Sequence, residues 1–173
     1  LYICKDTNHF SMVTAIFILL ILFILNGFFV MSEIALVSAR KTRLELDARN
    51  GDRAAKLALE NVNNPSRVLS TVQIGVTLIG ILTGVYSSDK IAHGAAILLQ
   101  AAGITPEVSH SLALAIVIVL VTFVSMLIGE LVPKRIGLIN PEGIARMMIR
   151  PVLALAYIIY PFTFILTRTG DLI

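Results

Sequence analysis

The segment Ser-Met-Leu-Ile-Gly-Glu-Leu-Val-Pro-Lys, which begins at Ser125, is rich in oxygen ligands. Proline has no N–H, so the carbonyl of Gly129, four residues before Pro133, loses its helical hydrogen-bond partner. This carbonyl, the Glu130 carboxylate and the Ser125 hydroxyl are hard oxygen groups, which cations such as magnesium prefer. The structural alternative is a helix that ends here at a surface, with Glu130 paired to Lys134.

A second set of polar and small residues recurs at spacings of three or four, which places its members on one face of a helix. They are Ser66, Ser70, Gln73, Thr77, Gly80 and Gly84. We expect Ser70, Gln73 and Thr77 to line a polar cavity. The two glycines form the small-xxx-small pattern by which helices approach closely, and their face is the expected contact of a dimer.

A third polar set consists of Asn26, Ser32 and Glu33, at the end of a long apolar run. Asn26 and Glu33 are seven residues apart and share a helical face. An acid at the edge of an apolar segment is costly unless it is paired or functional, so the alternative for Glu33 is a salt bridge to Arg40 or Lys41. No nucleophile with its base, phosphate loop or metalloprotease motif accompanies these groups, and we do not expect an enzyme.

The elements that carry these residues are apolar. Of the 173 residues, 57% are hydrophobic and 14% are charged, with a mean hydropathy of +0.88, whereas soluble domains have about 25% charged residues. This composition excludes a soluble enzyme or a nucleic-acid-binding domain. Uncharged runs of the length that crosses a bilayer predict an all-α integral membrane protein with spans at about 10–37, 66–87 and 108–132.

The remaining segments are too short or too polar to cross. Residues 141–168 contain Pro161, which removes a backbone donor and kinks a helix, so we expect a bent juxtamembrane or re-entrant segment there. Residues 38–66 predict a helix along the membrane surface, and residues 91–104 a short surface helix. Cys4 is the only cysteine, so no internal disulfide can form.

Basic residues set the expected orientation. Eleven of them flank the inner ends of the spans, whereas only Lys5 and Lys90 lie on the opposite side. By the positive-inside rule the N-terminus is outside and the segment 38–66 is cytoplasmic. We therefore expect a multi-pass protein of the inner or plasma membrane.

Three motifs, in order, resemble the transmembrane domain of the CorC/cyclin M family, whose bacterial members are often labelled hemolysin-like. They are Asn26-Gly-Phe-Phe-Val-Met-Ser-Glu-Ile-Ala-Leu-Val-Ser-Ala-Arg40, Val72-Gln-Ile-Gly-Val-Thr-Leu and Gly129-Glu-Leu-Val-Pro-Lys-Arg-Ile-Gly137. The resemblance covers roughly residues 12–168 and implies a homodimer of three-helix protomers. It also implies a following cytoplasmic pair of CBS domains, which this sequence does not encode.

The resemblance implies a site for a dehydrated magnesium ion between the three helices. The matching residues here are Ser32, Ser70, Ser125, Gly129 and Glu130, with Asn26, Glu33, Gln73, Thr77 and Pro133 along the substrate pathway. Two positions depart from the animal cyclin M pattern: Val30 replaces an expected serine and Val76 an expected asparagine. Neither valine can bind an ion through its side chain.

These observations leave three functions open. The first is efflux of Mg²⁺ or another divalent cation, coupled to Na⁺ entry as the resemblance implies. The second is export of small organic polycations such as diamines, for which the two valines would make a larger, softer pocket. The third is a membrane scaffold that senses a cation and regulates another transporter. In each case the expected partners are the lipid bilayer, a second copy of the chain and the cation, and not nucleic acid.

Overall fold

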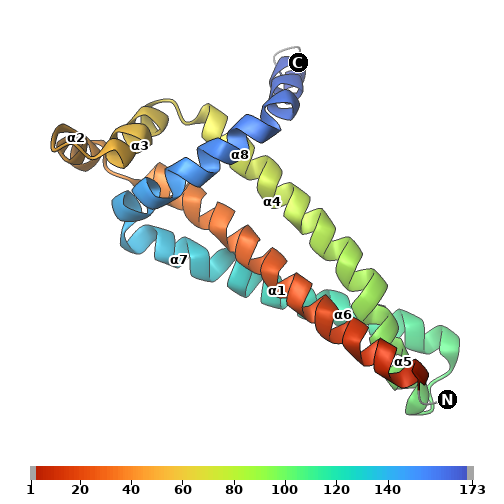
Figure 1. The fold of residues 1–173 in the computed structure, drawn as a ribbon. Helices are drawn as coiled ribbons and strands as arrows, with labels where there is room; N and C mark the ends of the chain where they lie inside the picture. The colour runs from red at the N-terminus through yellow and green to blue at the C-terminus, as the bar shows by residue number, and fades with distance from the viewer. Residues whose placement is uncertain (1–2, 171–173) are drawn as a thin grey trace. The chain divides into compact units, whose positions relative to one another are not determined.

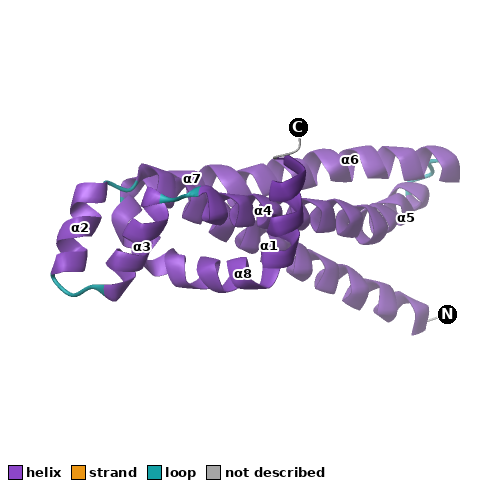
Figure 2. Cartoon of the chain, turned by 90° about the horizontal axis from the view of Figure 1, so that it is seen from above, coloured by secondary structure: helices purple, strands orange, loops and turns teal. Residues whose placement is uncertain are grey.

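The computed structural model describes residues 3–170, apart from the side chains of residues 3–12, 67, 88–90 and 159–170. The described chain is helical with short connecting loops and contains no strand (Figure 1 and Figure 2). The helices are α1 Ile3–Ser38, α2 Lys41–Arg49, α3 Arg53–Asn63, α4 Ser66–Tyr86, α5 His93–Ala101, α6 Pro106–Met126, α7 Val132–Ile139 and α8 Pro141–Gly170. Two π-helical turns, η1 Ser87–Ala92 and η2 Leu127–Leu131, lie between α4 and α5 and between α6 and α7.

Three helical segments of the described chain are long and apolar enough to cross a membrane, which confirms the expected number of spans. They are Val13–Ser38, Val68–Tyr86 and Pro106–Ile139. The third segment continues beyond its expected end at residue 132, because the π turn η2 leads directly into α7. Pro133 lies in the first turn of α7 and does not end the helical segment. Proline is tolerated in a first turn, where its missing N–H has no helical role.

The chain forms two compact units. The first contains Leu1–Asn26 and Leu78–Gly129, and the second contains Gly27–Thr77 and Glu130–Ile173. In the first unit, α5 packs against α6 and η1. The turn between α5 and α6 contains Gly103 with a φ of 94°, and the Gln100 amide donates to the buried Ser109 hydroxyl at 3.1 Å. The α5 helix falls within the expected surface segment 91–104.

In the second unit, the segment 38–66 is a pair of helices rather than the single surface helix that the sequence predicts. Gly51, with a φ of 93°, breaks the helix, and Asp52 then caps α3 by accepting hydrogen bonds from the N–H groups of Ala54 and Ala55. A capping carboxylate satisfies N–H groups that have no helical partner. The two helices α2 and α3 pack side by side, and α3 also contacts α8 (Figure 1).

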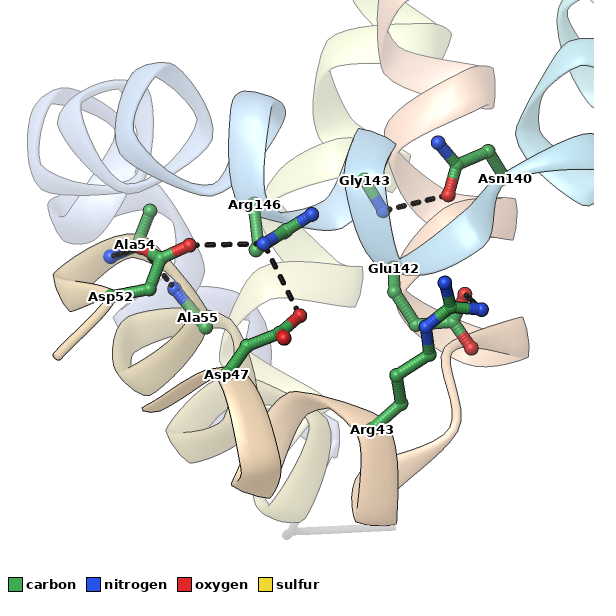
Figure 3. A network of polar contacts seen from close by, with 9 residues as sticks. All are labelled: Arg43, Asp47, Asp52, Ala54, Ala55, Asn140, Glu142, Gly143 and Arg146. Atoms are coloured by element: carbon green, nitrogen blue, oxygen red, sulfur yellow. Dashed lines mark hydrogen bonds and ion pairs between the residues drawn. The ribbon is translucent and has the colours of Figure 1, made fainter. Parts of the chain in front are cut away.

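The first turn of α8 contains a buried acid. Asn140 precedes Pro141 and accepts from the Gly143 N–H at 3.2 Å, which is the geometry of an N-cap. Glu142 follows, with a side chain only 3% exposed, and accepts from Arg40 Nε at 2.8 Å, with Arg43 at 4.0 Å. These contacts tie the start of α8 to the junction of α1 and α2. Figure 3 shows Arg43 beside Glu142 and Asn140 bound to Gly143.

One turn later on α8, Arg146 joins the same helix to the α2–α3 pair. Its Nη1 lies 3.2 Å from Asp47 Oδ2 and 3.1 Å from Asp52 Oδ2, as Figure 3 shows. Beyond these contacts α8 runs through Pro151 and Pro161 as one helix and changes direction in its C-terminal part (Figure 1). A bend at an internal proline is the expected consequence of the lost hydrogen bond.

Glycines allow close helix contacts within the second unit. A Cβ atom placed on Gly75 of α4 would lie 2.8 Å from Cζ of Phe29 on α1, whose side chain is buried. A Cβ atom on Gly137 of α7 would lie 3.1 Å from the carbonyl oxygen of Met31. The α1 helix therefore packs against the backbones of both α4 and α7.

We predict that Gly75→Ala destabilises the protein by about 1–3 kcal/mol, because the added methyl group overpacks a buried contact. Val85→Ala, at an exposed position on the same helix, is the control and should change the stability by less than about 0.5 kcal/mol. Thermal unfolding in detergent measures both. Equal effects of the two substitutions would contradict the packing described for Gly75.

The acid contacts of α8 predict an acid-sensitive structure. The Arg40 hydrogen bond lowers the pKa of Glu142 below its ordinary value of 4.5, against the opposing effect of burial. The Ala55 N–H chiefly lowers the pKa of Asp52 below 3.8. Because both pKa values are lower in the folded state, the stabilisation is complete above about pH 4.5 and is lost as pH falls through the lowered values.

We predict that Glu142→Gln lowers the free energy of unfolding at pH 7 by about 1.5–3 kcal/mol, the range for hydrogen bonds to charged groups. The variant should also lose less stability than the parent protein between pH 7 and pH 3. Glu60→Gln, an exposed acid on α3, is the control and should keep the parental pH profile. A parental pH profile in the Glu142 variant would show that this carboxylate does not cause the acid sensitivity.

Candidate functional site

The π turn η2 lies where the sequence predicts a freed carbonyl. Gly129 is in this turn and is buried. An α-helix would pair the Gly129 carbonyl with the N–H of residue 133, which is a proline and has none. Single π turns inside α-helices are often found at functional sites.

The Asn26 side chain contacts this turn. Its Nδ2 donates to the carbonyl oxygen of Gly129 at 3.1 Å. The approach is close, because a Cβ atom on Gly129 would lie 3.0 Å from the same nitrogen. The helices α1 and α6–η2 therefore meet at a glycine, with an amide instead of an aliphatic side chain between them.

This hydrogen bond leaves an oxygen without a partner. The Asn26 Oδ1 atom is buried and, among the described residues, accepts no hydrogen bond. A buried polar group with no partner costs about 1–3 kcal/mol, and such groups in folded proteins call for an explanation such as a bound water or ion. Asn26 and Gly129 thus place an unpaired amide oxygen and a backbone carbonyl in the same contact.

Ser125 and Glu130 flank Gly129 in the chain. Ser125 is partly exposed, one turn before Gly129. The Glu130 carboxylate forms an ion pair with Lys134 Nζ at 2.5 Å, and the two side chains are 46% and 41% exposed. The structural alternative for Glu130 is thus present as a contact. Because half-exposed i,i+4 pairs contribute only about 0.3–0.5 kcal/mol, the pair does not hold Glu130 away from another partner.

The polar residues near the end of α1 have different surroundings. Ser32 is fully buried and its hydroxyl donates to the Phe28 carbonyl at 2.7 Å. Glu33 is partly exposed and forms no salt bridge with Arg40 or Lys41 in the described structure, where Arg40 binds Glu142 instead. One of the two expected partners of Glu33 thus binds an acid that is distant in sequence, and Lys41 forms no ion pair among the described residues.

The polar face of α4 is open in the described chain. Ser70, Gln73 and Thr77 are exposed, and the Thr77 hydroxyl donates to the Gln73 carbonyl at 2.8 Å. Among the described residues, no atom lies within 4 Å of the Cβ positions of Gly80 and Gly84.

The two valines that depart from the animal cyclin M pattern are placed differently. Val30 is buried at 5% exposure and Val76 is partly exposed. No group of three or more His, Cys, Asp or Glu side chains that could hold a metal ion occurs among the described residues. Any cation bound at this turn would depend on amide, hydroxyl and carbonyl oxygens with at most one carboxylate nearby in the chain.

The sequence predicts Asn26 on the substrate pathway and Gly129 among the metal ligands, but it does not predict the hydrogen bond between them. An amide in the middle of an apolar run was the available signal. Nothing in the sequence indicated that its partner would be a backbone carbonyl 103 residues away. The other predicted ligands, Ser32, Ser70 and Glu130, share no hydrogen bond with one another in the described structure.

Comparison with known proteins gives the chain a family. Residues 17–173 match the domain described as "Cyclin M transmembrane N-terminal domain". The UPF0053 protein sll0260 of Synechocystis sp. is 41% identical over 156 residues, which are 90% of this chain and 35% of that protein. The UPF0053 protein YhdT of Bacillus subtilis is 29% identical over 153 residues, 88% of this chain and 33% of that protein.

A third relative has a name that states an activity. The polyamine export protein of Escherichia coli K12 is 33% identical over 162 residues, which are 94% of this chain and 36% of that protein. This chain thus spans about a third of the length of the curated relatives it matches. The match over nearly the whole chain, together with three helices able to span a bilayer, establishes that this multi-pass membrane protein belongs to the cyclin M transmembrane domain family.

Proposed function

We propose that the chain is the membrane domain of a cation transporter that binds its substrate at the π turn η2. The observation that carries the proposal is the buried Oδ1 atom of Asn26, which has no partner in the described structure while Nδ2 of the same amide holds the Gly129 carbonyl. An ion that has lost part of its water shell needs fixed oxygen atoms in its place. Asn26 Oδ1 and the second lone pair of the Gly129 carbonyl are suited to that role.

The neighbouring groups would complete the environment of the cation. We propose that the Ser125 hydroxyl supplies a further oxygen and that the Glu130 carboxylate, next in the chain to Gly129, supplies negative charge after it exchanges Lys134 for the substrate. The exposed, weak ion pair supports this exchange. The roles of Ser32, Glu33, Ser70, Gln73 and Thr77 remain predictions from sequence.

The transport step would use the same turn. Interruptions of transmembrane helices are tolerated where they line a cavity, and transporters place their substrates at such interruptions. We propose that the segment around Gly129 and Pro133 changes its helical register when the cation enters or leaves, because Pro133 provides no N–H that would fix the α-helical pairing of the Gly129 carbonyl. Outward movement of the cation, with Na⁺ entering, is the expected direction.

Two classes of substrate fit this site. Mg²⁺ or another divalent cation fits a cluster of carbonyl, amide and hydroxyl oxygens. A small organic polycation is supported by the export activity in the name of the Escherichia coli relative and by Val30 and Val76, which provide no side-chain ligand. Ammonium groups need acceptors but not a complete oxygen shell. Competition between Mg²⁺ and putrescine in one flux assay separates the two classes.

We also propose the membrane orientation and assembly of the chain. The basic residues at the ends of the spans support a cytoplasmic position for α2 and α3 and an N-terminus outside the cell, in the inner or plasma membrane. The open faces of Gly80 and Gly84 support a homodimer that forms through α4.

The proposal predicts unequal effects for the two members of the Glu130–Lys134 pair. Glu130→Gln should weaken the apparent affinity for the transported cation at least tenfold, about 1.4 kcal/mol, because it removes the only charge next to Gly129. Lys134→Met should have a small effect or increase affinity. The measurement is cation flux into proteoliposomes with a panel of Mg²⁺, other divalent ions and diamines.

Size-exclusion profiles and melting temperatures of both variants serve as the fold controls for this experiment. If the two substitutions changed flux equally and slightly, Glu130 would serve only as the surface partner of Lys134. Absence of flux for every cation in the parent protein, with intact cation binding, would favour a sensor over a transporter.

The dimer proposal predicts that the double substitution Gly80→Leu and Gly84→Leu separates the protomers, since bulky side chains prevent the backbones from approaching. Light scattering in detergent should show a shift from dimer to monomer. Ile81→Leu, at an exposed position on the same helix, is the control and should leave the mass unchanged. A parent protein that is monomeric, or a double variant that remains dimeric, would exclude this interface.

A further inference from the structure

The outward face of α8 is apolar, although the helix begins in an ionic network. Met147, Tyr157 and Ile158 are 63%, 80% and 74% exposed. Ala154 and Arg150 are exposed between them, so these residues follow one another at intervals of three or four and share a face. The opposite face is buried and includes Ala145, Met148, Ile149, Val152 and Ala156. The α8 helix therefore has one face that is buried in the second unit and another that is apolar and exposed in the described part of the chain.

Most of the acids near this helix are paired, whereas several of the cations near it are exposed and unpaired in the described structure. Three of the acids have internal partners: Glu142 binds Arg40 and lies near Arg43, while Asp47 and Asp52 both bind Arg146. Two further acids, Glu45 on α2 and Glu60 on α3, are exposed. Arg150, one turn after Arg146, forms no ion pair or hydrogen bond within the described part of the chain. The same holds for several exposed cations of α2 and α3, namely Lys41, Arg49, Arg53 and Lys56. The outward charges near α8 are thus mainly positive.

The place of α8 in the chain puts it at a membrane surface. The preceding candidate span, Pro106–Ile139, has 34 residues, which at about 1.5 Å per residue is longer than the roughly 30 Å hydrocarbon core. Its last residues therefore reach the headgroup region, and α8 begins two residues later. An apolar face that contains an arginine is the composition of helices that lie in the interface and bind anionic lipids. The long arginine side chain reaches the phosphates while its stem stays in apolar surroundings.

We propose that the exposed face of α8 is a docking surface for anionic phospholipids, with Arg150 as the residue that binds the headgroup phosphate and Met147, Ala154 and Ile158 in contact with the acyl chains. The unpaired cations of α2 and α3 raise the local concentration of the same lipids. This surface would select anionic over zwitterionic lipids whether or not the chain transports a cation, so it does not depend on the proposed function.

The chain contains no tryptophan, which allows a direct test. Single tryptophans are introduced by Met147→Trp, three residues from Arg150, and by Ile158→Trp, eight residues from it. Each protein is reconstituted in bilayers of phosphatidylcholine and phosphatidylglycerol, in which one lipid at a time has bromine atoms near the headgroup end of its acyl chains. Bromine quenches the fluorescence of a tryptophan that it contacts, so the comparison gives the relative affinity of the two lipids at each position.

We expect both tryptophans to be quenched, and phosphatidylglycerol to bind at least threefold more tightly than phosphatidylcholine next to Trp at position 147. Arg150→Gln should abolish this preference, whereas Arg135→Gln, an exposed arginine on α7, should preserve it. A tryptophan introduced by Phe17→Trp at an exposed position of the first span is the control and should be quenched equally by both lipids in every variant.

Three results would overturn the proposal. Equal quenching by both lipids at position 147 would show an apolar surface without headgroup selection. A preference that persists in Arg150→Gln would exclude Arg150 as the phosphate ligand. No quenching by either lipid at positions 147 and 158, with normal quenching at position 17, would show that a protein surface such as a second copy of the chain covers α8.

Discussion

The missing N–H of Pro133 is the constraint from which the candidate site follows. It removes the α-helical partner of the Gly129 carbonyl, and the chain forms the π turn at Leu127–Leu131 where this partner is lost. In a membrane an unsatisfied carbonyl is expensive, and the Asn26 amide satisfies it across the contact between two helices. The amide can do so only with its nitrogen, so its oxygen is left buried and without a partner in the described structure. The missing N–H of Pro133 thus leads to a buried, unpaired Oδ1 atom on Asn26.

The first helix accommodates this arrangement because small residues face it. Gly129 admits the Asn26 side chain, Gly75 admits the Phe29 ring, and Gly137 admits the backbone near Met31. Ion pairs, and not close glycine contacts, join α8 to the segment that contains α2 and α3. There, buried Glu142 binds Arg40, and Asp47 and Asp52 both bind Arg146. Since these contacts use most of the nearby acids, the exposed arginine of α8 remains available for anionic lipids.

The apolar runs were sufficient to predict three spans, because length and hydrophobicity alone decide whether a helix can cross a bilayer. The Pro133 effect at Gly129 was also predictable, since it depends only on residues four positions apart. Two features were not. The break between α2 and α3 depends on Gly51 adopting a positive φ. It was not predicted because the residues on both sides of Gly51 have a helical composition. The partner of Arg40 proved to be Glu142 rather than Glu33, because sequence proximity does not determine which acid the fold buries.

Cation binding by an Asn26→Leu variant tests the central claim most directly, since leucine keeps the branched skeleton of the asparagine side chain but provides neither its donor nor its oxygen. Isothermal titration of the purified protein with Mg²⁺ and, separately, with putrescine should give at least a tenfold weaker affinity for the cation that the parent protein binds, about 1.4 kcal/mol. Asn26→Asp, which restores an oxygen and adds charge, should recover part of that affinity. A folded Asn26→Leu protein with the affinity of the parent would contradict the account, because the unpaired oxygen beside Gly129 would then take no part in binding.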